Sequence, residues 1–173
     1  MRSAPPTHPP AYLSPRNRGG STPHPTSADA EATFSRKGRR DRAHSLDLVF
    51  HDIAEPRPGL VAPSRADVAS LLGFGESWDG SRPFLVHCQM GISRSTAAAL
   101  ILAAGARPAL DEFDLAAGLR EAAPCATPNP LMIALADELL DRKGRLVAAV
   151  REIGRGADYV PYRMFALDLP AIA

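Results

Sequence analysis

The segment 84–96 constrains the fold of this chain more than any other part of its sequence. A short apolar run ends at His87 and Cys88, and Arg94 follows after five intervening residues. The alanine-rich stretch 97–104 comes next, so the order of residues predicts a strand, a tight loop and a helix. A loop in this position hangs from a helix N-terminus, where unpaired backbone N–H groups and the helix dipole favour a bound anion.

The residues between and after Cys88 and Arg94 make their Cys-x5-Arg spacing more specific. Gly91 lies in the middle of the loop, where the backbone must approach a ligand closely, and Ser95 directly follows the arginine. The segment resembles the phosphate-binding loop of the cysteine-dependent protein tyrosine phosphatases. It is nearest in style to the dual-specificity type and to small bacterial proteins predicted to be tyrosine phosphatases. The resemblance covers residues 46–140.

The chemistry of phosphoryl transfer accounts for these residue types. The attacking group must be a thiolate, and a helix N-terminus, converging N–H groups and Arg94 are all expected to lower the pKa of Cys88. The planar fork of Arg94 can hold two phosphoryl oxygens at once. The resemblance implies that Ser95 helps the sulfur leave in the second step and that a buried His87 orients the loop. The predicted phosphate-binding residues are Gln89, Met90, Gly91, Ile92, Ser93 and Arg94.

Cleavage of a phosphate ester also needs an acid that protonates the departing oxygen, and then a base that activates water. Asp52, just past a predicted strand at 46–50, is the candidate for both steps. Dual-specificity phosphatases have an aspartate in this relation, one crossover upstream of the cysteine. Glu55 and Asp47 are the competing acids, and Asp47 faces away from the site if its neighbours in the strand are buried. The alternative role for Asp52 is a local hydrogen bond in a turn.

The pattern of apolar runs predicts an α/β fold with a short parallel sheet flanked by helices. Strands at 46–50 and 83–87 are joined by a helix that begins with a capping box at Ser64. Parallel strands end at the same sheet edge, so we expect Asp52 and Cys88 to meet there. The phosphatases that the chain resembles begin with further strand and helix elements, so the predicted sheet is an N-terminally incomplete version of their fold.

Downstream of the loop the chain is predicted to be helical. Helices are expected to begin near Ser95, Asp111, Asn129 and Arg145, with Asp111 and Asn129 as N-caps. In dual-specificity phosphatases a Pro-Asn pair at the start of such a helix borders the active site. Asn129 therefore has two candidate roles, helix capping and support of the phosphate loop. The segment 158–173 is a C-terminal tail, undecided between an edge strand and loose coil.

Composition favours one catalytic domain, residues 44–157. The chain has 173 residues, 45% of them apolar, and a formal net charge of +1. Its two cysteines look unpaired, which indicates a reducing compartment and a cytoplasmic protein. No apolar run approaches the ~20 residues that span a bilayer, so no membrane partner is expected. Neither a metal nor another cofactor is expected, because His87 and Cys88 are adjacent and no second Cys/His pair has ligand spacing.

Residues 1–43 are predicted to be a disordered tail, because they are rich in proline and arginine and poor in aliphatic side chains. The basic run 36–40 could bind nucleic acid, although a solvated tail is the favoured interpretation. The predicted function is a phosphomonoester hydrolase that forms a cysteinyl-phosphate intermediate and acts on a phosphorylated protein or a small phosphate ester. The alternatives are an inactive phosphate-binding module, a nucleic-acid-associated protein acting on RNA 5′ phosphates, and a structural cysteine beside an unrelated arginine.

Overall fold

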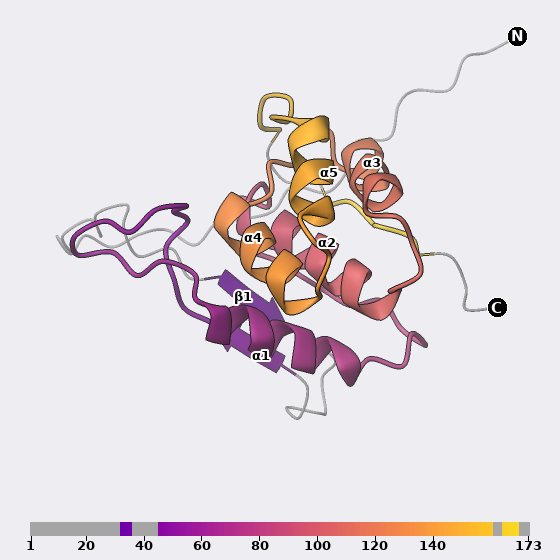
Figure 1. Cartoon of the computed structure of the whole chain (residues 1–173), viewed down its shortest axis with the longest axis horizontal. Coiled ribbons are helices and arrows are strands. Elements are labelled where there is room, and N and C mark those ends of the chain that lie inside the picture. Colours follow the sequence, from indigo (N-terminus) through magenta and orange to yellow (C-terminus); the bar gives the residue numbers. More distant parts are fainter. Residues whose placement is uncertain (1–31, 36–44, 161–163, 170–173) are drawn as a thin grey trace, which may run out of the picture.

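The computed structural model describes residues 32–35, 45–160 and 164–169. Figure 1 shows α2 near the centre of the molecule, with α1 on one side and α3 on the other. Two four-residue strands, β1 and β2, pair antiparallel. The elements are β1 (Ala32–Ser35), β2 (Ser45–Leu48), α1 (Arg65–Glu76), α2 (Arg94–Ala106), α3 (Glu112–Ala122), α4 (Pro130–Leu139) and α5 (Arg145–Ile153).

The predicted α/β fold with a parallel sheet is wrong. The described residues form a body of five helices, and their two short strands pair only with each other. The segment 83–87, predicted as a parallel partner of β2, has no regular secondary structure and one isolated bridge position at His87. An apolar run favours extended backbone, but pairing depends on a neighbouring strand that the run itself does not encode. The predicted phosphate loop therefore connects an irregular segment, rather than a sheet strand, to α2.

The predicted helix starts are confirmed. The Ser64 hydroxyl accepts a hydrogen bond from the Asp67 amide at 3.2 Å, and the Asp67 carboxylate accepts one from the Ser64 amide at 2.8 Å. The side chains of Asp111 and Asn129 likewise accept hydrogen bonds from amides in the first turns of α3 and α4. These contacts satisfy N–H groups that the first turn of a helix leaves unpaired, so local chemistry fixes where α1, α3 and α4 begin.

The core of the molecule is built around α2, which is buried on almost every side. Fully burying one leucine or isoleucine side chain contributes about 1.5–3 kcal/mol of transfer free energy. Because α2 begins at Arg94, packing in the core also fixes the loop directly before it. The buried apolar residues of α2 are Ala97, Ala98, Leu100, Ile101, Ala103 and Ala104.

Only four residues of the predicted N-terminal tail 1–43 are described, and these form β1. For the segment as a whole, a disordered tail stays a prediction. The rest of that segment, including the basic run 36–40, lies outside the described residues. None of the described helices has the length and the apolar character that crossing a membrane requires.

The chain that follows α5 packs back onto the body. Phe165, Leu167 and Leu169 lie against the core, although residues 164–169 form neither helix nor strand. The Arg120 guanidinium joins the C-terminal end of α5 to the segment before α4, because it donates hydrogen bonds to carbonyl oxygens of both. Its acceptors, at 2.6–3.2 Å, are the carbonyls of Pro124, Ala126, Ile153 and Gly154.

Candidate active site

Cys88 lies just before the N-terminus of α2, with polar groups facing its sulfur. The hydroxyl oxygen of Ser95 is 3.2 Å from Sγ, and the Gly91 amide donates a hydrogen bond to Sγ at 3.2 Å. Gly91 has a φ of +72°, a left-handed conformation that residues with a Cβ rarely adopt. The loop therefore requires glycine at this position to direct an amide at the sulfur.

The pKa of the Cys88 thiol is lowered from its ordinary value. Burial is the largest influence and acts in the opposite direction, because desolvation disfavours the thiolate. Hydrogen bonds from the Ser95 hydroxyl and from the backbone amides of Ser95, Gly91 and Met90 together outweigh the effect of burial on this pKa. These groups, rather than the charge of Arg94 that the sequence predicted, are the largest influences that lower this pKa. Cys88 is therefore more ionised at neutral pH than an ordinary cysteine.

The N-terminus of α2 has no side-chain cap. Ser93 occupies the N-cap position, but its hydroxyl donates a hydrogen bond to Asp52 Oδ1 at 2.7 Å. In contrast, α1, α3 and α4 each begin with a side chain that accepts hydrogen bonds from their first amides. The first amides of α2 are thus left to the sulfur of Cys88 or to an anion bound beside it.

Asp52 lies beside the loop, as predicted, although no parallel sheet brings it there. Its Oδ1 accepts hydrogen bonds from Ser93 Oγ at 2.7 Å and from Asn129 Nδ2 at 2.8 Å. Its Oδ2 is 3.8 Å from Arg94 Nε. These partners are distant in the sequence, so Asp52 does more than complete a local turn. Because Oδ1 already accepts two hydrogen bonds, Oδ2 is the atom that can carry a transferable proton.

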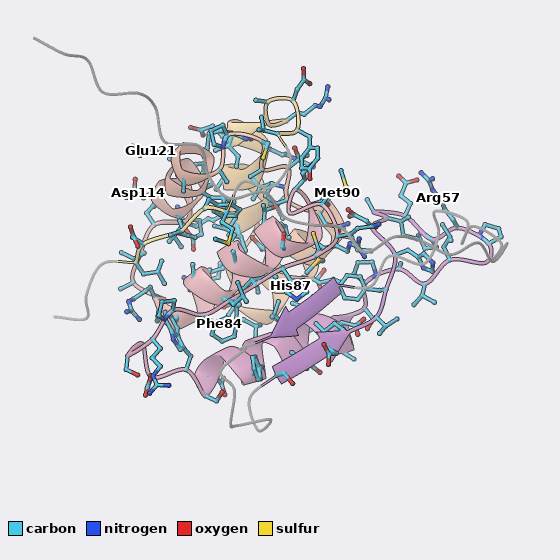
Figure 2. The ribbon with its side chains drawn as sticks, turned by 180° about the vertical axis from the view of Figure 1, so that it is seen from behind. Arg57, Phe84, His87, Met90, Asp114 and Glu121 are labelled. Atoms are coloured by element: carbon cyan, nitrogen blue, oxygen red, sulfur yellow. The ribbon has the colours of Figure 1, made fainter. Side chains whose placement is uncertain are left out.

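The two competing acids do not share this environment. Asp47 is exposed on β2 while its neighbour Leu48 is buried, which confirms that Asp47 faces away from the core. Glu55 is exposed on the loop that follows Asp52. Figure 2 shows that this loop, which also bears Arg57, extends away from the helices. Of the three carboxylates, Asp52 is the one hydrogen-bonded to the loop 88–93.

Arg94 is the first residue of α2, and its side chain is only 3% exposed. Its Nη1 donates a hydrogen bond to the carbonyl oxygen of Phe50 at 3.0 Å, and its Nε faces Asp52. The guanidinium is therefore buried between the start of α2 and the segment 50–52, with little freedom to move. A fixed, planar guanidinium next to the loop suits bidentate recognition of phosphoryl oxygens.

The segment 127–129 holds the loop from outside. The Thr127 amide donates to the Ile92 carbonyl at 2.9 Å, and the Asn129 amide donates to the Ser93 carbonyl at 3.3 Å. In a trans peptide unit the N–H points opposite to the C=O. Because these two carbonyls point toward the segment 127–129, the N–H groups of the same peptide units point away from that segment. The amides of Ser93 and Arg94 are oriented by these two contacts.

The Asn129 side chain caps α4, as the sequence suggested, and also binds the segment that carries Asp52. It is 2% exposed, and its Oδ1 caps α4 by accepting the amides of Leu131 and Met132 at 3.1 Å. Its Nδ2 donates to Asp52 Oδ1 and, at 3.3 Å, to the carbonyl of Ile53. One side chain thus ties the start of α4 to the candidate acid.

The His87 side chain is not buried as the sequence predicted. This side chain was predicted to be buried and to orient the loop, but it is exposed and makes no hydrogen bond to another described residue. Figure 2 shows His87 near the strands and Met90 farther along the loop. Gln89 is exposed and Met90 is 49% exposed, whereas Gly91, Ile92 and Ser93 are half-buried. Phosphate binding by this loop would therefore rely on backbone amides more than on side chains.

Two contacts of the site were not predicted from the sequence. Ser93 was predicted as a phosphate-binding residue, but its position before a helix suggests an N-cap, and nothing local indicates that its hydroxyl binds Asp52 instead. Thr127 contributes a backbone amide, which has no side-chain signature. Both contacts depend on how distant segments pack together.

Among the residues that the structure describes, no group of three or more His, Cys, Asp or Glu side chains is arranged to hold a metal ion. No protein-family model matches the chain, and no match was found among curated proteins or solved structures. The proposal below therefore depends on the geometry of the site and on the loop motif.

Proposed function

We propose that the protein is a phosphomonoester hydrolase of the cysteine-dependent tyrosine phosphatase type. The observation that carries this proposal is the setting of Cys88: its sulfur accepts hydrogen bonds at the start of a helix that lacks a side-chain cap, and its pKa is lowered. A buried structural cysteine has no need of such a setting. A thiolate there is a nucleophile, and the amides beside it can bind an oxyanion.

In the first step, Cys88 Sγ forms a bond to phosphorus as the ester P–O bond breaks. Asp52 gives its proton to the departing oxygen, which leaves as an alcohol or phenol. In the second step, Asp52 takes a proton from water, the water oxygen attacks phosphorus, and the S–P bond breaks. The Ser95 hydroxyl then hydrogen-bonds the thiolate that leaves, and the loop amides and Arg94 bind the phosphoryl oxygens throughout.

The direct test is hydrolysis of p-nitrophenyl phosphate by the purified full chain. We expect turnover that vanadate inhibits, and trapping by acid quench of phosphate bound to Cys88. Binding of vanadate without turnover would favour the inactive phosphate-binding module instead. Absence of both binding and turnover would contradict the proposal. A thiolate nucleophile must stay reduced, so the proposal also implies a reducing compartment such as the cytoplasm.

Asp52→Asn should slow hydrolysis of an alkyl phosphate by about 10²–10⁴-fold, the usual contribution of general acid catalysis. Asparagine can still accept the hydrogen bonds from Ser93 and Asn129, so the site keeps its shape. An aryl phosphate with an acidic phenol as leaving group needs no proton, so its cleavage should slow much less. The exposed Asp47→Asn is the matched control and should behave as wild type. Equal losses for both substrates would argue against proton transfer by Asp52.

The lowered pKa of Cys88 predicts the pH dependence of its alkylation. Because the folded protein releases the thiol proton at a lower pH, iodoacetamide should modify Cys88 at pH values where an ordinary cysteine is mostly protonated. Ser95→Ala removes a hydrogen bond that lowers this pKa, so its rate curve should move to higher pH. Mass spectrometry of the Cys88 peptide gives the rate. Superimposable curves for wild type and Ser95→Ala would contradict the assignment of the hydroxyl.

A further inference from the structure

The loop that carries Asp52 is closed at its base by His51 and Val61. The His51 amide donates to the Val61 carbonyl at 2.8 Å. The Val61 amide in turn donates to His51 Nδ1 at 2.8 Å. Two short hydrogen bonds therefore join the ends of the segment 51–61, and one of them uses a side chain rather than the backbone.

The direction of the hydrogen bond from the Val61 amide to Nδ1 defines which nitrogen of the imidazole carries the proton. A nitrogen that accepts a hydrogen bond from an amide must be unprotonated, so the ring proton lies on Nε2. The Val61 carbonyl, 3.3 Å from the same Nδ1, already accepts the His51 amide. The contact of Nδ1 with the Val61 amide, at 2.8 Å, is the shorter of the two.

Asp52 is held on both sides by these contacts. Directly before it, His51 is joined to Val61 by two hydrogen bonds. Directly after it, the Ile53 amide donates to the His51 carbonyl at 3.0 Å, and the Ile53 carbonyl accepts from Asn129 Nδ2. The i to i+2 hydrogen bond makes Asp52 the central residue of a tight turn. The two hydrogen bonds between His51 and Val61 therefore fix the backbone on one side of Asp52, and the contacts of Ile53 fix it on the other.

We propose that the His51 imidazole is a positioning residue, which acts through the Val61 amide to hold Asp52 where it can transfer a proton to the leaving group. This inference rests on the proposed phosphatase function. Val61 is 60% exposed, so water can replace a lost acceptor, and removing the imidazole acceptor should change the stability of the fold little. Proton transfer is more sensitive, because a misplacement of about 1 Å can cost about 10²-fold in rate.

Two variants of similar size separate this role from simple packing. In His51→Asn the amide oxygen branches from Cγ, as Nδ1 does, and can accept the Val61 amide. In His51→Gln the amide lies one carbon farther out and cannot accept in the same geometry. The substrates are an alkyl phosphate, which needs proton transfer, and an aryl phosphate with an acidic phenol, which does not.

We expect His51→Gln to lower kcat for the alkyl phosphate by about 10–100-fold and for the aryl phosphate by less than about threefold. His51→Asn should stay within about threefold of wild type on both substrates. Amide hydrogen exchange at Val61 should be fast in His51→Gln and slow in wild type and His51→Asn. His51→Ala, which leaves the Val61 amide to water, is the second test variant if His51→Gln does not fold.

The positioning role is overturned if His51→Gln keeps the leaving-group dependence of wild type, or if His51→Asn is impaired as much as His51→Gln. A uniform loss on both substrates would also overturn it, because that result reports damage to the phosphate loop. These outcomes leave the phosphatase proposal intact. Wild-type protein that hydrolyses neither substrate would instead refute the proposed function, and the positioning role with it.

Discussion

Cys88→Ser should lower phosphatase turnover by at least about 10⁴-fold, because a serine hydroxyl at this site has no base to activate it and remains a poor nucleophile. Binding of vanadate or phosphate should persist, since the oxyanion is held by backbone amides and Arg94 rather than by the sulfur. Removing the thiolate also removes a negative charge that repels the anion. Isothermal titration with phosphate and hydrolysis of p-nitrophenyl phosphate measure the two effects separately.

Cys125→Ser is the matched control for this experiment. Cys125 is the other cysteine of the chain, and both cysteines are free and partly buried. It lies outside the loop 88–94, so its replacement should leave turnover and phosphate binding as in wild type. Full activity in Cys88→Ser, or equal losses in the two serine variants, would contradict the assignment of Cys88 as nucleophile.

Arg94→Lys should reduce turnover by about 10²–10³-fold, the usual cost of losing one preorganised donor to the transition state. Lysine keeps the positive charge but not the planar fork, so it cannot donate to two phosphoryl oxygens in the same geometry. The affinity for phosphate should fall as well, because ground state and transition state share these oxygens. Steady-state kinetics and phosphate titration provide the measurements.

Arg142→Lys controls for the loss of a buried guanidinium as such. Arg142 donates to the carbonyls of Pro108 and Ala104 at 2.9 and 2.8 Å and forms an ion pair with Glu112, all away from the loop. Its replacement should lower the melting temperature without altering phosphate affinity. If Arg94→Lys only lowers the melting temperature in the same way, the guanidinium of Arg94 has a structural role and does not bind phosphate.

Helix boundaries were predictable because they depend on short-range chemistry. Ser64, Asp111 and Asn129 each bind amides within three positions of themselves, and all three caps are confirmed. The inward face of α4 was less predictable. Leu131, Leu135 and Leu139 recur at helical spacing, whereas the most buried apolar residues are Met132, Ile133 and Ala136. Since α4 is apolar on most of its surface, periodicity alone does not define which side packs inward.

The approach of Asp52 to the loop was predicted, but for a reason that the structure does not support. The expected cause was a parallel sheet, and the observed cause is a set of hydrogen bonds from Ser93 and Asn129. Side-chain amides and hydroxyls can act locally or across the fold, and the sequence does not indicate which. The Asn129 side chain acts both locally and across the fold, because its acceptor oxygen caps α4 while its donor nitrogen binds Asp52.

The outside contacts of 127–129 with the loop have a practical consequence for transplanting this site. Three chain segments meet there, 51–53, 88–97 and 127–132, and neither of the two described strands belongs to them. A designer who grafts the site onto another scaffold would therefore need two helix starts and one tight turn at the right spacing, and could dispense with a sheet. Hosts for such a graft can be sought among plain helical bundles.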